Sequence, residues 1–455
     1  MTDPVLSRSL RRIATDLAEG TLTASALQQA TAACHDAALN AYVTWTPDLA
    51  RRQAVAADAA FAAGARLGGL QGIPVSLKDL YGVAGLPTFA GTPAPLPPAF
   101  SKDGPVVTRL RRQLAVIVGK SHTVEMAFGG LGTSGHHPTP WNPRDRVLHR
   151  APGGSSSGAG VSVVEGTALV AFGTDTGGSV RIPASLTGTV GLKTTLGRWS
   201  TSGIVPLSPS FDTPGILTRS ADDATFAFEA LDPARVPDCD GALRLGVAGT
   251  FFWNDTSPGI AERLTDALRL IEADGAKISD VNLPGVDEVF DIYRQGGIVS
   301  AELYAFLRDT LPDVLQSLDP RVRRRMDEGK ALEAWEYLHR KARYAALSAE
   351  AAAVLGPLDA VICPTVPLTP PPVALLDDPD TYARLNLLTL RNTCVVSFLG
   401  LCAVSIPTGL DAEGMPVGLQ LIGAAQTEPR LLALARRIER VLARAGAWMP
   451  PHSLD

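Results

Sequence analysis

Residues 150–193 constrain the fold of this chain more than any other stretch, because glycine and small hydroxyl residues are concentrated there. Two glycine- and serine-rich turns, residues 153–158 and 173–179, flank an apolar run over residues 161–172 that alternates too little for a surface segment. Glycine permits left-handed backbone and close approach of other atoms, and successive N–H groups in such a turn suit an anion. We therefore predict that the two turns form the active centre, each with a serine beside exposed backbone N–H groups.

The composition excludes several classes of protein. The chain has 455 residues, 45% hydrophobic and 19% charged, with a net charge of −5, which suits a globular protein and gives no basic surface for nucleic acid. Its five cysteines form no C-x-x-C pair, so we expect no disulfide framework and a cytoplasmic protein. The N-terminus lacks the apolar segment of a signal peptide, and no apolar window is long enough to span a bilayer. We expect neither export nor a membrane partner.

Strands and helices alternate at both ends of the chain. The expected helices are residues 7–19, 25–37, 47–63, 108–112 and 428–443, and the expected strands are residues 41–45, 73–77, 114–119, 243–247, 359–363, 402–406 and 417–422. Between them, residues 220–356 are predicted to be a largely helical insert. No internal repeat or low-complexity linker interrupts the pattern, which favours a single α/β domain over residues 1–455.

Two short motifs resemble nucleotide-binding loops but fail on context. Residues 119–121 read Gly-Lys-Ser, yet the phosphate loop needs a glycine five residues earlier, where this chain has Leu114. Residues 130–135 match G-x-G-x-x-G, but the continuation His-His-Pro-Thr-Pro cannot open a helix. We therefore expect no nucleotide cofactor.

Three histidines, His136, His137 and His149, lie in or near a proline-rich loop. A metal site needs several ligands that converge, and no carboxylate cluster accompanies these histidines. We interpret them as surface residues and expect no metal.

The glycine-rich centre offers serines as nucleophiles, and a serine needs a base. Residues 154–158 satisfy G-x-S-x-G, so an α/β-hydrolase esterase with Ser156 as nucleophile is one alternative. Only His339 and His452 follow the turns, and neither has a matching acid. A lysine can replace histidine where burial makes it neutral, and Lys78, at the end of an apolar segment, is the candidate.

At this point the chain resembles the amidase signature enzymes, serine hydrolases that cleave amide C–N bonds. The resemblance rests on G-x-P-x-x-x-K-D around Lys78 and on four further segments, residues 152–158, 173–183, 191–193 and 416–423. The step of 24 residues from Ser155 to Ser179 is similar to that between the family's bridging and nucleophilic serines. The resemblance implies an α/β/α sandwich around a large mixed β-sheet, with both turns at one sheet edge.

The resemblance also implies a Ser-cisSer-Lys triad, in which Ser179 is the nucleophile, Ser155 the bridging serine and Lys78 the base. A cis peptide bond is expected between Gly154 and Ser155. Such an enzyme cleaves a carboxamide through an acyl-enzyme on Ser179 and releases ammonia or an amine. Esters and carbamates stay open as further substrates.

The remaining site residues follow from the same resemblance. The oxyanion hole is expected at the backbone N–H groups of Thr176, Gly177, Gly178 and Ser179. Substrate contacts are expected from Gly129, Gly130 and Ser155, and the two glycines are interpreted as room for a bulky or aromatic acyl group. Structural support through hydrogen bonds, a buried ion pair or turn capping is expected from Gly154, Ser156, Asp175, Arg181 and Asp212. Residues 157–159 depart from the family, with Ser-Gly-Ala where Gly-Gly-Ser is common.

Two alternatives concern partners. In a tRNA-dependent glutamine amidotransferase, the A subunit releases ammonia for its partner, but the chain ends soon after the helix at residues 428–443, which favours a stand-alone amidase. A catalytically idle binding protein would have no need to keep Lys78, Ser155 and Ser179 together. We therefore expect a small-molecule amide as the substrate, no nucleic acid partner and no cofactor, and the oligomeric state stays open, a homodimer included.

Overall fold

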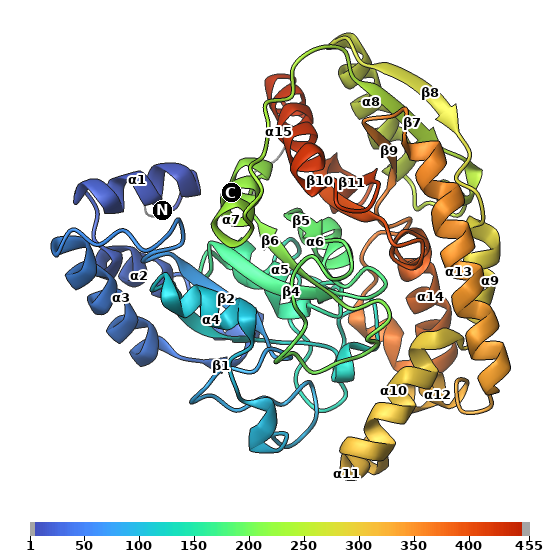
Figure 1. Ribbon diagram of the computed structural model, residues 1–455, viewed down its shortest axis with the longest axis horizontal. Coiled ribbons are helices and arrows are strands. Elements are labelled where there is room, and N and C mark those ends of the chain that lie inside the picture. The colour runs from blue at the N-terminus through green and yellow to red at the C-terminus, as the bar shows by residue number, and fades with distance from the viewer. Residues whose placement is uncertain (1–4, 448–455) are drawn as a thin grey trace.

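One mixed sheet of 11 strands runs through the protein (Figure 1). The computed structural model describes residues 5–447. From one side to the other the strands are β1 (Tyr42–Trp45), β3 (Val116–Ser121), β2 (Pro74–Lys78), β4 (Val170–Asp175), β6 (Thr213–Thr218), β5 (Val190–Lys193), β10 (Cys402–Leu410), β11 (Pro416–Gly423), β9 (Ala360–Pro364), β7 (Arg244–Ala248) and β8 (Lys277–Val281). β2 is parallel to β3 and β4, and β7 is parallel to β8 and β9, whereas the other neighbours are antiparallel.

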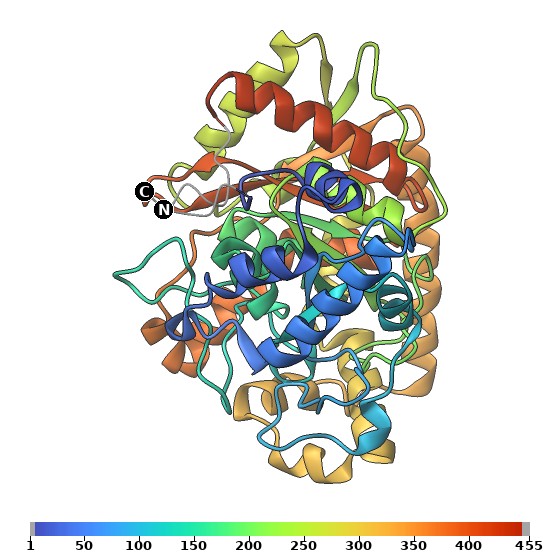
Figure 2. The same ribbon diagram turned by 90° about the vertical axis from the view of Figure 1, so that its left-hand side faces the viewer.

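Helices cover both faces of this sheet. On one face lie α3 (Pro47–Ala62), α7 (Ala221–Leu231), α8 (Ile260–Ala273) and α15 (Glu428–Arg444), with α1 (Leu10–Glu19) and α2 (Ala24–Ala32) packed beside them. Figure 2 looks onto this layer, where the blue N-terminal helices and the red α15 face the viewer. On the other face lie α5 (Ser157–Glu165), α6 (Arg181–Thr187) and α14 (Pro379–Phe398). The predicted α/β/α arrangement is confirmed.

The side chains of β4 show how one strand serves both layers. Val170 and Phe172 belong to the larger core with the first layer of helices, whereas Ala171 packs with Ala159 and Val163 of α5. Successive residues of a strand point to opposite faces of the sheet. A strand buried on both faces therefore reads as a continuous apolar run, which is what the sequence shows here.

The predicted helical insert forms much of the outer wall on the right of Figure 1. It contains α9 (Val286–Arg294), α10 (Gly297–Thr310), α11 (Pro312–Ser317), α12 (Pro320–Asp327) and α13 (Ala334–Leu355), together with α7, α8, β7 and β8. The strand β8 was not predicted. It is the outermost strand and most of its residues are exposed or half-buried, so it lacks the apolar run that marks an inner strand.

The apolar run at residues 161–172 is two elements rather than one. α5 ends at Gly166 in left-handed backbone, and β4 starts at Val170. A buried helix and a buried strand are both apolar on all sides, so periodicity alone does not separate them. α14 was not predicted either. Of its 20 residues 12 are buried, and six of these 12 are polar, so its sequence shows no single apolar face. Within residues 5–447, no helix has the length and apolar character needed to cross a membrane.

Gly158 lies where the first turn of α5 meets backbone from the end of β3. Its N–H donates to the carbonyl of His122 at 3.0 Å, and a Cβ here would lie 2.0 Å from the carbonyl oxygen of Ala41. Because that neighbour is backbone, we predict that Gly158→Ala lowers the free energy of unfolding by about 1–3 kcal/mol. Chemical denaturation measures this. Gly356→Ala is the control, since its Cβ would meet nothing closer than 3.4 Å, and equal stability of the two variants would contradict the packing described.

Candidate active site

The two predicted turns meet at the carboxyl ends of β2 and β4. Lys78 is the last residue of β2, and the turn at residues 176–180 follows β4 directly. Ser155 lies just before α5, in the other turn. The sequence predicted both turns at one edge of the sheet. Because β2 and β4 are inner strands, this edge consists of the ends of strands and not of an outermost strand. Strand ends are where open α/β sheets form ligand sites.

Lys78 and Ser155 are in direct contact. The Nζ of Lys78 donates to the Oγ of Ser155 at 2.7 Å and to the Oγ1 of Thr174 at 2.8 Å. Lys78 and Ser155 are each 0% exposed. The expected cis peptide bond between Gly154 and Ser155 is present. The contact with Thr174 was not anticipated from the sequence, although Thr174 lies within the predicted turn.

The surroundings of Lys78 favour its neutral form. Burial lowers the pKa of Lys78 to about 7, and the nearby carboxylates of Asp212 and Asp175 act in the opposite direction. Within the described residues, neither carboxylate comes within 4.0 Å of its Nζ. Lys120 is buried equally deeply but contacts Asp79 at 2.7 Å. Lys78 is therefore a buried amine that can be neutral at physiological pH.

Ser179 lies next to the Ser155 turn through backbone contact. The N–H of Ser156 donates to the carbonyl of Ser179 at 3.2 Å. In the described part of the chain, no hydrogen bond joins the Oγ atoms of Ser155 and Ser179. The structure thus contains the hydrogen bond between Lys78 and Ser155, and it brings Ser179 next to the turn that carries Ser155.

A buried ion pair fixes the turn that carries Ser179. Asp175 accepts two hydrogen bonds from the guanidinium of Arg181, at 3.0 Å from Nε and 2.9 Å from Nη2, and both side chains are 0% exposed. Burial raises the pKa of Asp175, but Arg181 outweighs it and the pKa falls to about 2. The same carboxylate accepts the N–H groups of Gly178 at 2.7 Å and Val180 at 3.2 Å. Asp175 and Arg181 therefore support the whole turn, as expected, and we call this ion pair with its hydrogen bonds to the turn the Asp175–Arg181 clamp.

The contact with Asp175 changes the expected oxyanion hole. Because the Gly178 N–H already donates to a carboxylate, it is not free to bind an oxyanion. The N–H groups of Thr176, Gly177 and Ser179 have no acceptor within residues 5–447. Gly178 is needed for another reason: its φ is +135°, and a Cβ would lie 2.1 Å from the Oγ1 of Thr393.

Ser156 supports the loop through hydrogen bonds to Thr174. Its Oγ donates to the carbonyl of Thr174 at 3.3 Å and accepts from the Thr174 N–H at 3.4 Å. His339 is exposed on α13, and His452 lies outside the described residues. Within residues 5–447, Ser156 has no hydrogen bond to a histidine. This arrangement does not support the esterase alternative.

Asp212 caps a turn, as expected, and also contacts the turn at residues 176–180. Its carboxylate accepts the N–H groups of Leu207 at 2.9 Å and Ser208 at 3.0 Å, and the hydroxyl of Thr176 at 2.5 Å. Burial raises the pKa of Asp212 to about 6. Its charge therefore titrates in the same range as that of Lys78.

A cavity of about 20 Å³ adjoins Ser179, which is space for about one water molecule. Gly129 lines this cavity and Gly130 does not. Side chains already fill the space beside both glycines, because a Cβ would lie 2.9 Å from the hydroxyl of Tyr382 or from Leu390 respectively. The two glycines therefore leave no open space beside Ser179, and their contact with the substrate stays a prediction.

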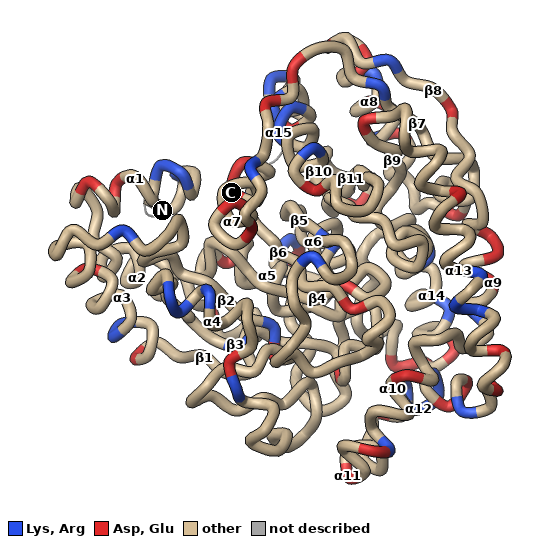
Figure 3. Tube along the Cα trace, viewed as in Figure 1, with Lys and Arg blue, Asp and Glu red and all other residues tan. Residues whose placement is uncertain are grey.

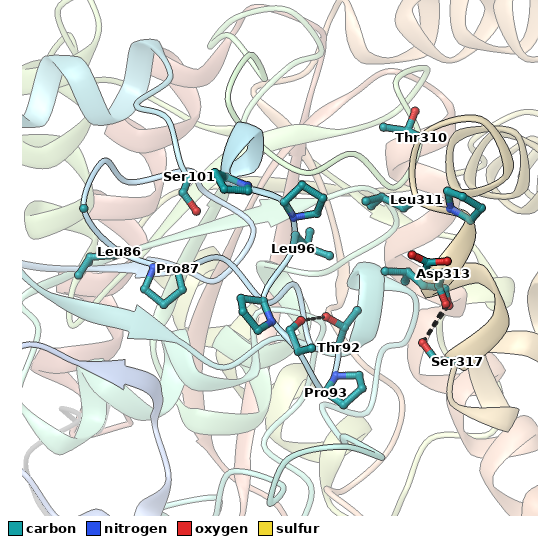
Figure 4. A pocket seen from close by; sticks show the side chains of 17 residues that line it. Leu86, Pro87, Thr92, Pro93, Leu96, Ser101, Thr310, Leu311, Asp313 and Ser317 are labelled. Carbon is teal, nitrogen blue, oxygen red and sulfur yellow. Dashed lines mark hydrogen bonds between the residues drawn. The ribbon is translucent and has the colours of Figure 1, made fainter.

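A larger pocket, of about 790 Å³, lies elsewhere. Figure 4 shows it between a proline-rich loop, with Pro87 and Pro93, and the start of α11, with Leu311 and Asp313. None of the predicted site residues lines it. Size alone therefore does not mark the site.

The three histidines point to different partners. The Nε2 of His136 lies 3.2 Å from a carboxylate oxygen of Glu125, whereas His137 contacts a backbone carbonyl and His149 stacks on Trp141. Within the described residues, no three His, Cys, Asp or Glu side chains are grouped so that they could hold a metal ion.

Sequence comparison defines the class of protein. The family model described as Amidase matches residues 22–432, so the chain belongs to this family. It is an amide-cleaving hydrolase that acts on C–N bonds.

Individual relatives refine this class. The chain is 47% identical over 450 residues to 2-amino-5-chloromuconic acid deaminase of Comamonas testosteroni, with 97% of each chain covered. It is 32% identical to mandelamide hydrolase of Pseudomonas putida, with 89% of this chain and 85% of that one covered. A solved amidase structure superposes with a TM-score of 0.86 at 31% identity, over 97% of this chain and 100% of that chain. The deaminase is thus considerably more similar than the other two.

The Asp175–Arg181 clamp leads to a prediction about stability. Arg181→Met leaves the Asp175 carboxylate buried without its cation, so we expect the free energy of unfolding to fall by about 3–5 kcal/mol. Chemical denaturation measures the change. Arg308→Met is the control, because Arg308 and Asp309 form an exposed pair and its loss should have little effect. A clamp variant as stable as this control would contradict the interpretation.

Proposed function

We propose that this amidase forms an acyl-enzyme on Ser179, with Lys78 as the base and Ser155 as the relay between them. The observation that carries the proposal is the 2.7 Å hydrogen bond from the fully buried Nζ of Lys78 to the Oγ of Ser155. A serine becomes a nucleophile when a base within hydrogen-bond reach accepts its proton. Lys78, with a pKa of about 7, can be that base.

The reaction balances without a cofactor. Neutral Lys78 takes a proton from Ser155 while Ser155 takes one from Ser179, and the Oγ of Ser179 bonds to the amide carbon. As the tetrahedral intermediate collapses, the C–N bond breaks and the relay, run in reverse, protonates the leaving nitrogen. Water then attacks the ester carbonyl with the same base, which releases the acid and restores Ser179.

The negative charge that develops on the carbonyl oxygen needs donors. We assign this role to the free backbone N–H groups of Thr176, Gly177 and Ser179, which follow one another around the clamped turn. In a well-studied hydrolase one such donor contributes about 3–4 kcal/mol. The clamp of Asp175 on this turn supports the proposal, because preorganised donors need no rearrangement during reaction.

The relatives support a narrower substrate class. The name of the Comamonas testosteroni deaminase specifies an amino-substituted organic acid, and a deaminase releases ammonia. Because the acyl-enzyme route needs an amide carbonyl, we propose a primary amide of a small organic acid as the substrate and ammonia as the leaving group, processed by one catalytic domain that acts without a partner protein. The five free cysteines support a cytoplasmic location.

The relay can be tested by substitution. We predict that Ser179→Ala and Lys78→Ala each lower kcat by about 10⁴-fold or more, and that Ser155→Ala lowers it by about 10³-fold or more, because the serine is left with positioning and the oxyanion hole alone. A panel of primary amides, aryl amides, esters and carbamates, together with 2-amino-5-chloromuconic acid, provides the assay. Ser156→Ala should have a milder effect, since Ser156 only bonds to Thr174.

Chemical labelling separates this proposal from its alternatives. A fluorophosphonate should add its mass to the peptide that contains Gly177-Gly178-Ser179, and Ser179→Ala should prevent it. Labelling of Ser156 would instead support the esterase. Release of ammonia from glutamine only after addition of the other amidotransferase components would support the amidotransferase alternative.

The pH dependence follows from the same base. Because burial lowers the pKa of Lys78 to about 7, the amine is protonated below that pH and cannot accept a proton. We predict that kcat/KM rises with pH through about 7, and falls about tenfold per pH unit on the acid side. A pH–rate profile measures this. Asp212→Asn removes a charge that raises the pKa of Lys78, so its midpoint should lie at lower pH, and a profile flat through neutrality would exclude Lys78 as the base.

A further inference from the structure

Arg325 lines the same small cavity as Ser179. The cavity is formed by the turn at residues 176–180, by residues 127–129 and by side chains from the helical insert. Apart from Arg325, the insert and α14 contribute Tyr293, Val299, Leu390 and Phe398, so the walls are mostly apolar or aromatic. Among the residues that line the cavity, Arg325 is therefore the one cation, and it lies on the same small space as Ser179.

Each of the other arginines of α12 forms an ion pair with a carboxylate. Its four arginines lie in the segment Pro320–Asp327, whose one acidic residue is Asp327, and Figure 3 shows acidic residues of other segments close to this helix. Arg321 pairs with Asp319 at 2.7 Å, Arg323 with Asp327 at 3.7 Å and Arg324 with Asp380 at 3.1 Å. Within residues 5–447, no carboxylate oxygen lies within 4.0 Å of a nitrogen of Arg325. Arg325 is thus the exception on its helix.

Aromatic groups hold the guanidinium of Arg325 in place without neutralising it. It lies over the ring of Phe128 at 4.1 Å from the centroid and over that of Tyr293 at 5.2 Å, and its Nη2 donates to the hydroxyl of Tyr293. In the described part of the chain, Nε and Nη1 have no acceptor. Glu328 acts on the pKa of Arg325 but forms no ion pair with it. Burial lowers the pKa of Arg325, whereas Asp319 raises that of Arg321.

A guanidinium in an apolar cavity is costly unless an anion joins it. Arginine presents parallel N–H donors that match a carboxylate in bidentate geometry. From the free donors and their position beside Ser179, we infer that Arg325 binds a carboxylate of the substrate, at the end remote from the bond that is cleaved. The preferred substrates are then small amides that carry a carboxylate. This inference rests on the proposed role of Ser179 and assigns the residue that selects the acid.

The experiment uses two readouts on the full-length protein. The first is the rate at which a neutral fluorophosphonate labels Ser179, which tests the nucleophile independently of any substrate. The second is protection from labelling, together with kcat and KM, for the monoamides of fumaric, succinic, glutaric and adipic acid. Each monoamide is paired with its neutral diamide, which is nearly the same shape and lacks the carboxylate.

In the wild-type protein, the carboxylate member of at least one pair should bind roughly 10- to 100-fold more tightly than its diamide, the range expected for charge-assisted hydrogen bonds. Arg325→Met should abolish this preference through KM, and Arg325→Lys should retain part of it. The labelling rate without ligand should stay near that of the wild type. A defect that is only structural would weaken both members of a pair, so the ratio between them isolates the carboxylate.

Arg324→Met is the matched control, because Arg324 is the neighbouring arginine, its side chain is 61% exposed and it pairs with Asp380. It should keep the wild-type ratio. The inference is overturned if every pair binds equally in the wild type, if Arg325→Met keeps the preference, or if inorganic phosphate protects in place of the carboxylates. Absence of labelling at Ser179 would instead remove the proposed function itself.

Discussion

The site depends on one condition: Lys78 is shielded from water and forms no ion pair that would stabilise its charge. Among residues 5–447, three lysines are fully buried, Lys78, Lys120 and Lys193. Lys120 contacts the carboxylate of Asp79, and Lys193 donates to the backbone carbonyls of Thr194 and Leu401. Lys78 alone of these three donates to two hydroxyls. These surroundings suit the proposed role of Lys78 as a base, because a hydroxyl can give a proton to an amine and the carbonyls that Lys193 contacts cannot.

The same region must also keep the pKa of Lys78 from falling too far. Desolvation alone disfavours the ammonium, and the charges of Asp175 and Asp212 act against it from beyond contact distance. Backbone N–H groups hold both carboxylates, and Asp175 is held by N–H groups of the turn at residues 176–180, which also donates the Thr176 hydroxyl to Asp212. The geometry of the turn and the basicity of the lysine are therefore not independent.

Local signals predicted most of the fold and part of the site. Inner strands such as β2, β10 and β11 were predicted because they are apolar and bounded by turns. The resemblance to amidases predicted that Lys78 and Ser155 lie together. The apolar run before Gly173 was not resolved into α5 and β4, because burial on all sides removes the periodicity that distinguishes them. The hydrogen bond of Gly178 to Asp175 and the filled space beside Gly129 depend on how distant segments pack, which no local pattern contains.

Arg325 was missed for a related reason: its sequence context, three consecutive arginines on an amphipathic helix, is typical of a solvated surface. Only the tertiary contacts show that one of the three turns inward, onto Phe128, while its neighbours find carboxylates. Arginine stays protonated in proteins, whereas lysine shifts its pKa readily when buried. The two proposals agree with this difference, because Lys78 is proposed to move a proton and Arg325 to keep its charge. In the proposed site, one cation acts as a base and the other as an anchor without exchanging their roles.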